Sequence, residues 1–280
     1  MNSSQFKANE FKKLCVMISF KPKDIENILG NLDNYYKEWV EKKIDKKTGL
    51  PKIYLDGSEK IRIIRPSQKE LKIIQSRIKN KILAPIKLPK AVHGGVKKCS
   101  NITNAKPHQG NKYIFTTDLQ EFYPNITSRR VYETFINYFS PHFSHWLTNL
   151  TTWKHELPQG TPTSTHIANL VFLKTDIELI NFCNINNITY TRYVDDLTFS
   201  SPKDFKNHLN HLLNIVTENN FKLSYRKTQY KGNQTITGIN VFLNKIDAPD
   251  EIIAKSKLEI ENNVDIKHYT NYLTNIRKTN

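Results

Sequence analysis

The chain has 280 residues, with 42 Lys or Arg against 26 Asp or Glu, and its formal net charge is +16. This excess predicts a polyanionic partner, most simply nucleic acid, and on charge alone leaves open a protein that binds membranes or anions nonspecifically. Three scattered cysteines argue against a disulfide framework or zinc site. The sequence shows neither a signal peptide nor an apolar run of ~20 residues, so we expect a soluble, cytoplasmic protein without a membrane partner.

The first part of the chain predicts helices and one small hairpin. Residues 1 to about 50 mix polar and apolar positions in a way that indicates a helical N-terminal region. Residues 52–55 and 60–64 predict two short strands around a turn at Asp56-Gly57. Pro66-Ser67 then opens a predicted helix. Its apolar residues recur at helical spacing at Leu71, Ile74, Ile78 and Ile82.

The middle and the end of the chain predict a loop, then strands and helices. From about residue 84 to 112 the sequence is basic and broken by Pro and Gly, which indicates a loop-rich segment. Residues 113–118 predict a strand with Asp118 on the same face as Ile114 and Thr116. Further helices are expected over residues 128–150, 163–180, 203–218 and the last 30 residues. Further strands are expected in a hairpin at 189–200 and near 221–225 and 235–243.

The run Tyr193-Val-Asp-Asp196 is the most informative feature of the sequence. Residues on both sides of it are rich in β-branched and aromatic side chains, as in strands, and the Asp-Asp pair falls where a tight turn would join them. Two carboxylates at a hairpin tip repel each other and add nothing to a core. We therefore expect divalent cations to neutralise them, with Mg²⁺ as the natural partner of oxygen ligands and Mn²⁺ as its alternative.

Asp118 supplies a third carboxylate. An acidic residue at the end of an apolar strand serves equally well as a helix cap when it is considered alone. Together with Asp195 and Asp196, it would complete a centre for two metal ions ~3.5–4 Å apart. Such a centre activates an attacking hydroxyl and stabilises a leaving pyrophosphate, which is nucleotidyl transfer. The three aspartates are thus the predicted catalytic and metal-binding residues.

Two other positions carry weaker signals. Gln159 lies in Leu157-Pro-Gln-Gly160, directly before a predicted helix. A Pro-x-Gly turn commonly precedes a helix, so its role there is structural. The alternative role of Gln159 is to contact an incoming nucleotide. Lys227 lies in Ser224-Tyr-Arg-Lys-Thr228, and a solvated surface role is the default for a single lysine. Beside a pyrophosphate leaving group, its ammonium would neutralise charge and donate a proton, which makes Lys227 a catalytic candidate.

These segments together resemble a known family. In chain order, the Asp118 segment, Leu157-Pro-Gln-Gly160, Tyr193-Val-Asp-Asp196 and Ser224-Tyr-Arg-Lys-Thr228 resemble palm motifs A to D of reverse transcriptases, over roughly residues 50–245.

Within that superfamily the chain resembles the retron reverse transcriptases. Asn104-Ala-Lys-Pro-His108 is similar to their Asn-Ala-x-x-His element, and Ile236-Thr-Gly238 is similar to their Val-Thr-Gly element. The resemblance implies an α+β fold of the right-hand polymerase type, with fingers, a palm whose antiparallel sheet packs on helices, and a short helical thumb. The implied divisions are an N-terminal helical region over 1–50, fingers over 51–112, a palm over 113–235 with a fingers insertion around 128–155, and the palm end with a short thumb over 236–280.

The resemblance also implies roles for single residues. Tyr123, five residues after Asp118, matches the bulky position that excludes a 2′-OH and so favours dNTPs; the alternative is a packed core tyrosine. Lys60 and Arg62 match fingers positions that hold the triphosphate, against an ordinary surface role. The resemblance also implies that Gln159 contacts the dNTP.

Asn104 and His108 lie in the loop-rich basic segment, and the retron-like spacing implies contact with a cognate RNA. The alternative is that Asn104 caps a turn and His108 packs locally.

The implied function is an RNA-directed DNA polymerase of a bacterial anti-phage retron. It copies part of its own structured noncoding RNA, primed from a 2′-OH in that RNA, into branched multicopy single-stranded DNA. The implied partners are that RNA and its DNA product, dNTPs, a separately encoded effector protein, and a host RNase H, because no RNase H signature follows the palm. Two rivals stay open: another bacterial defence-associated reverse transcriptase, and a catalytically silent, RNA-binding palm that acts as a scaffold.

Overall fold

The computed structural model describes residues 3–44, 49–53 and 57–280. The chain divides into two compact units, one formed by Met1–Lys87 with Tyr123–Val171 and the other by Leu88–Phe122 with Phe172–Asn280. Both mix helices with antiparallel strands, so the predicted α+β class is confirmed. No helix within the described ranges is both long enough and apolar enough to cross a bilayer.

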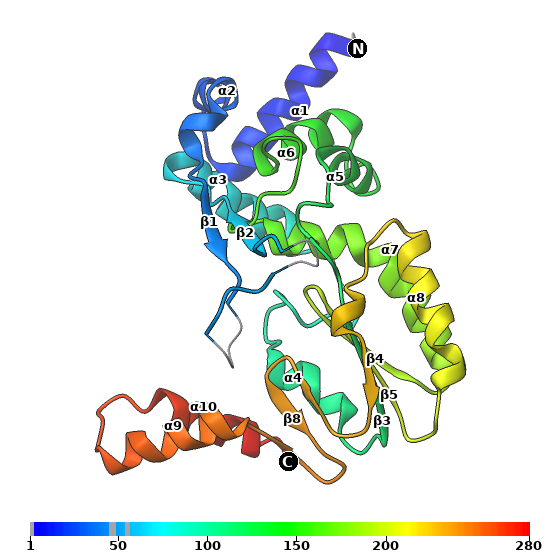
Figure 1. Cartoon of the computed structure of the whole chain (residues 1–280). Coiled ribbons are helices and arrows are strands. Elements are labelled where there is room, and N and C mark those ends of the chain that lie inside the picture. Colours follow the sequence, from blue (N-terminus) through cyan, green and yellow to red (C-terminus); the bar gives the residue numbers. More distant parts are fainter. Residues whose placement is uncertain (1–2, 45–48, 54–56) are drawn as a thin grey trace. The chain divides into compact units, whose positions relative to one another are not determined.

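The first unit is mainly helical (Figure 1). Its helices are α1 (Ser3–Ile18), α2 (Pro22–Gly30), η1 (Leu32–Tyr35), α3 (Lys69–Ile78), η2 (Lys79–Leu83), α5 (Ser128–Phe135), α6 (Pro141–Thr151) and the first turns of α7 (Ser164–Ile185). The apolar stripe predicted for the helix after Pro66 is buried at all four positions, Leu71, Ile74, Ile78 and Ile82. Buried Gln75 ties this core together, because its amide donates to the Tyr36 hydroxyl at 3.0 Å and to the Leu150 carbonyl at 2.9 Å.

The same unit holds a two-stranded sheet that the sequence assigned differently. β1 (Trp39–Lys42) pairs antiparallel with β2 (Ile61–Ile64), so the expectation of helix up to about residue 50 is wrong for this stretch. Trp39 and Val40 favour a strand once an isoleucine-rich partner lies opposite them. In the predicted 52–55 strand, Ile53 forms one bridge with Glu59, and residues 54–56 lie outside the described residues.

The second unit is built on a four-stranded antiparallel sheet with the order β4-β5-β3-β6 (Figure 1). Its strands are β3 (Tyr113–Asp118), β4 (Thr189–Tyr193), β5 (Asp196–Ser201) and β6 (Gln229–Lys231). The predicted strand at 113–118 and the predicted hairpin are confirmed. The end of α7 packs beside α8 (Leu209–Glu218), where the rings of Phe182 and His211 lie 4.4 Å apart.

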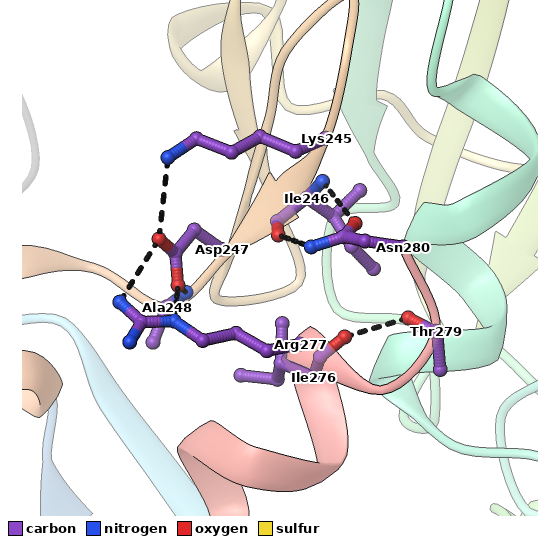
Figure 2. A network of polar contacts seen from close by, with 8 residues as sticks. All are labelled: Lys245, Ile246, Asp247, Ala248, Ile276, Arg277, Thr279 and Asn280. Carbon is purple, nitrogen blue, oxygen red and sulfur yellow. Dashed lines mark hydrogen bonds and ion pairs between the residues drawn. The ribbon is translucent and has the colours of Figure 1, made fainter.

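A three-stranded sheet of β7 (Gln234–Ile236), β8 (Ile239–Val241) and β9 (Ile246–Asp247) belongs to the same unit. It shares an apolar core with α4 (Asn101–Ala105) and α10 (His268–Arg277), while α9 (Asp250–Glu261) packs on α10. Figure 2 shows the polar contacts between the C-terminal end of the chain and β9. Arg277 and Lys245 form ion pairs with the Asp247 carboxylate. The Asn280 side chain accepts from the Ile246 N–H and donates to the Ile246 carbonyl. The expected helical C-terminus is confirmed.

Three elements of this unit depart from expectation. The predicted loop at 84–112 contains α4 and η3 (Lys106–His108), which are too short to show apolar periodicity; a capping box between Ser100 and Thr103 starts α4. The helix expected from 203 begins later, with η4 (Lys206–His208) before α8. The strand expected near 221–225 is reduced to one bridge between Leu119 and Leu223, followed by η5 (Tyr225–Lys227).

Candidate active site

The hairpin of β4 and β5 carries two of the candidate residues, Asp195 and Asp196. Tyr193 pairs with Asp196, so the turn itself consists of Val194 and Asp195. Val194 has φ 59°, a left-handed conformation that β-branched residues rarely adopt. Such a residue costs on the order of 1–3 kcal/mol and persists only where its surroundings impose it, commonly at functional sites.

Strand pairing brings the three predicted aspartates together. The register of β3 against β5 sets Asp118 opposite Asp196. Beyond the end of β3, the Leu119 N–H donates to the Asp195 carbonyl at 2.9 Å. Asp118 is buried, whereas Asp195 in the turn and Asp196 at the start of β5 are half-buried.

The three carboxyl groups interact strongly. Burial, together with the neighbouring charges of Asp195 and Asp118, raises the pKa of Asp196 to about 7. A hydrogen bond between the Asp118 and Asp196 carboxyls acts in the same direction. Over the described residues, no group of three or more Asp, Glu, His or Cys side chains is already arranged to hold a metal ion.

Lys227 lies beside the aspartates. Its Nζ is 2.6 Å from Asp118 Oδ2, while the Ser224 N–H donates to the Asp118 carbonyl at 2.7 Å and holds the start of η5 against β3. The lysine side chain is 59% exposed, so the ammonium stays close to solvent. It also lowers the pKa of Asp196, against the larger effects of burial and of the two carboxylates.

A pocket of about 180 Å³ adjoins Asp118, Asp196 and Lys227. Most of its other lining side chains are neutral hydroxyls and amides on β3, β5, β6 and the β7–β8 hairpin, including Thr117, Thr198, Gln229, Gln234, Thr235 and Thr237. Gln234 is fixed there, since its amide donates to the Ile114 carbonyl at 2.6 Å. Only Thr237 was part of a segment singled out from the sequence, Ile236-Thr-Gly238, and no pocket was expected there. The other lining residues were missed, because single Thr and Gln residues on short strands carry no motif.

The four predicted dNTP contacts belong to the first unit. Half-buried Tyr123 has its hydroxyl 3.1 Å from Thr165 Oγ1, and the Gln159 carbonyl accepts from the Arg65 N–H at 2.7 Å. Arg62 is exposed on β2, and Lys60 immediately precedes that strand. These four residues therefore belong to the first unit, whereas the second unit contains Asp118, Asp195, Asp196 and Lys227.

The contacts of Asn104 and His108 argue against direct RNA contact. Both side chains are completely buried. The His108 ring nitrogens lie 2.6 Å from Ser200 Oγ and 2.7 Å from Thr191 Oγ1, and burial lowers the pKa of His108 to about 3, so the ring is neutral. The Asn104 amide donates to Thr237 Oγ1 at 3.3 Å. These contacts favour the local-packing alternative.

We accordingly expect His108→Ala to reduce activity equally on a cognate RNA and on a plain primer–template. Loss of the ring leaves a cavity and removes one hydrogen bond each from Ser200 and Thr191, which keep their bonds to the Asn111 amide and the Asn104 carbonyl. The free energy of unfolding should therefore fall by about 2–4 kcal/mol. Denaturant unfolding and paired extension assays measure both effects. Selective loss on the cognate RNA would instead favour recognition by this segment.

Two buried residues behind the turn were also missed. Arg192 and Asp176 are completely buried and form an ion pair at 2.6 Å, between Arg192 Nη2 and Asp176 Oδ2. The available signal was an arginine in the middle of an otherwise uncharged strand, which requires a buried partner.

The electrostatics of the aspartate group predict a pH effect on stability. Folding raises the pKa of Asp196 from 3.8 to about 7, so this group stabilises the metal-free protein most below pH 3.8 and loses that contribution as the pH rises through about 7. Asp196→Asn should therefore stabilise the metal-free protein at pH 8 by on the order of 2 kcal/mol, and by less at pH 5. Thermal unfolding in EDTA at both pH values tests this, and a pH-independent difference would contradict it.

Comparison with known proteins identifies the family. Residues 44–241 match the family model described as "Reverse transcriptase (RNA-dependent DNA polymerase)". This match covers more than half of the chain, and the chain belongs to the reverse transcriptase family.

Its curated relatives are named as retron enzymes. The chain is 33% identical to the retron Se72 reverse transcriptase of Salmonella heidelberg (strain 579083-10), over 60% of this chain and 45% of that protein. It is 31% identical to the retron Ec86 reverse transcriptase of Escherichia coli, over 68% of this chain and 62% of that protein. The matches thus span about half to three-fifths of the length of these relatives.

Among solved structures, the chain is similar to apo telomerase from Candida Tropicalis truncated from its C-terminal domain. The TM-score is 0.45 and the sequence identity 10%, over 82% of this chain and 61% of that chain. This similarity is too distant to indicate function.

Proposed function

We propose that the chain is the RNA-directed DNA polymerase of a retron, which copies part of a cognate structured noncoding RNA into branched multicopy single-stranded DNA. The observation that supports this most is the cross-strand group of Asp118, Asp195 and Asp196 with Lys227 beside it, in a member of the reverse transcriptase family. The retron names of the relatives and the net charge of +16 point the same way. The divisions belong to this proposal: an N-terminal helical region over 1–50, fingers over 51–112, a palm over 113–235 with a fingers insertion around 128–155, and the palm end with a short thumb over 236–280.

The proposed cofactor is a pair of Mg²⁺ ions, with Mn²⁺ as the alternative. Asp118, Asp195 and Asp196 would hold them, because carboxylates are hard oxygen donors and their mutual repulsion, which raises the pKa of Asp196, is relieved by a divalent cation. Bound metal would supply activation of the attacking hydroxyl and neutralisation of charge on the transferred phosphate.

The chain's own residues would complete the reaction around that centre. Lys227, already paired with Asp118, would neutralise the leaving pyrophosphate and donate a proton to it. Tyr123 and Gln159 would contact the sugar and base side of a dNTP, and Lys60 and Arg62 its triphosphate.

Tyr123→Ala should raise the use of rNTPs relative to dNTPs by about tenfold or more, because the ring would no longer block a 2′-OH. Tyr123 is half-buried, with its hydroxyl bonded to Thr165, so Tyr123→Phe removes that bond and keeps the ring. Steady-state incorporation of matched rNTP and dNTP measures the ratio. An unchanged ratio in a folded Tyr123→Ala protein would favour a packing role.

Expression of the chain with the DNA immediately upstream of its coding region tests the retron assignment. The expected product is single-stranded DNA joined to RNA, and it should disappear with Asp118→Asn. DNA synthesis that needs no dedicated RNA would indicate another defence-associated reverse transcriptase, while RNA binding without any synthesis would indicate a scaffold. An effector protein and a host RNase H are the further partners that we propose.

A further inference from the structure

The backbone of the Val194–Asp195 turn is held from two sides. Arg192 Nη1 donates to the Val194 carbonyl at 2.8 Å, and the Leu119 N–H donates to the Asp195 carbonyl at 2.9 Å. Both carbonyls of the strained turn are therefore bonded within the same unit. Because Asp195 and Asp196 follow Val194 directly, the orientation of their side chains depends on this backbone.

Arg192 is itself held in one orientation. Its Nε and Nη2 bond the two oxygens of Asp176 at 2.9 and 2.6 Å, and its guanidinium lies 4.7 Å from the Phe172 ring centroid. The Tyr190 hydroxyl donates to the same carboxylate at 2.8 Å. With these two nitrogens fixed, the rigid guanidinium can direct only Nη1 at the turn.

A third contact confines the turn from the side. Residues 91–94 run beside β4, with Arg192 N–H donating to the Ala91 carbonyl and His93 N–H donating to the Arg192 carbonyl, both at 2.8 Å. Gly94 then packs so closely on Val194 that an added Cβ would lie 2.3 Å from the Val194 nitrogen. A glycine is needed here, which connects Gly94 to the conformation of the turn.

A fully buried ion pair is a poor way to gain stability, because desolvation offsets the attraction. The hydrogen bond from Arg192 to the Val194 carbonyl indicates a role other than stability. We propose that Arg192 is a positioning residue for catalysis: oriented by Asp176, it holds the Val194–Asp195 turn so that Asp195 and Asp196 present their carboxylates to metal. This role rests on the proposed polymerase function.

Arg192→Lys tests the proposal, because lysine keeps the charge beside Asp176 but cannot reproduce the two-pronged pairing together with the bond to Val194. The matched control is Arg277→Lys, which alters a second Arg–Asp pair, with Asp247, in the same unit (Figure 2). We expect Arg192→Lys to raise the Mg²⁺ concentration for half-maximal incorporation and to lower kcat, each by about 10–100-fold, with the Kd for primer–template within about twofold. Arg277→Lys should leave the Mg²⁺ requirement unchanged.

Amide hydrogen exchange gives a readout that needs no activity. Faster exchange of residues 194–196 and of Leu119 in Arg192→Lys, and not in Arg277→Lys, supports the positioning role. If Arg192→Lys fails to fold, the double variant Arg192→Met with Asp176→Asn removes both buried charges and keeps an oxygen for Tyr190.

A folded Arg192 variant with a wild-type Mg²⁺ requirement and wild-type exchange at the turn would overturn the positioning role. If the wild-type protein incorporates no dNTP, the polymerase function fails instead. The exchange comparison then decides alone whether Arg192 holds the turn.

Discussion

Asp195→Asn is expected to reduce dNTP incorporation by at least ~10³-fold while the affinity for RNA stays nearly unchanged. The amide keeps the shape of the side chain and removes a charge from the group formed with Asp118 and Asp196. A steady-state extension assay in Mg²⁺, with RNA binding measured in parallel, tests both parts.

Asp265→Asn provides the matched control. It makes the same chemical change at an exposed residue between α9 and α10, so it corrects for the added net positive charge. Near-normal extension by Asp195→Asn would exclude a two-metal centre at this turn.

Binding to structured RNA is expected to weaken steeply as salt is added. If the excess Lys and Arg neutralise 6–10 phosphates, affinity should fall by ~10³–10⁵-fold between 50 and 200 mM salt on the scale of duplex DNA, and by less for RNA. Fluorescence anisotropy with a labelled structured RNA at constant Mg²⁺ measures the slope. A Kd that does not change with salt would show that phosphate neutralisation does not drive the complex.

The sequence predicted well those features that depend on local pattern. The strand ending at Asp118 and the hairpin around Asp195 and Asp196 both occur, because short runs rich in β-branched and aromatic residues beside a turn are strong local signals. The helix after Pro66 buries its predicted stripe for the same reason.

Features that depend on distant partners could not be predicted. β1 is a strand because β2 lies opposite it, about 20 residues away in sequence, and no local pattern records that pairing. α4 is set by a capping box of two side chains rather than by apolar periodicity.

The site shows the same division between local and distant signals. The motif residues were found from the sequence, whereas the burial of His108 between Ser200 and Thr191 required the three-dimensional structure. Arg192 was visible as a charge within a strand, but its bonds to Asp176 and to Val194 were not. The supporting residues were missed because their partners lie on α7 and within the turn.

RNA-templated DNA synthesis by the purified chain tests the central claim most directly. With a primer annealed to an RNA template, dNTPs and Mg²⁺, we predict extension to the 5′ end of the template, and no extension in EDTA. A folded protein that binds this primer–template but incorporates no dNTP with Mg²⁺ or Mn²⁺ would contradict the claim.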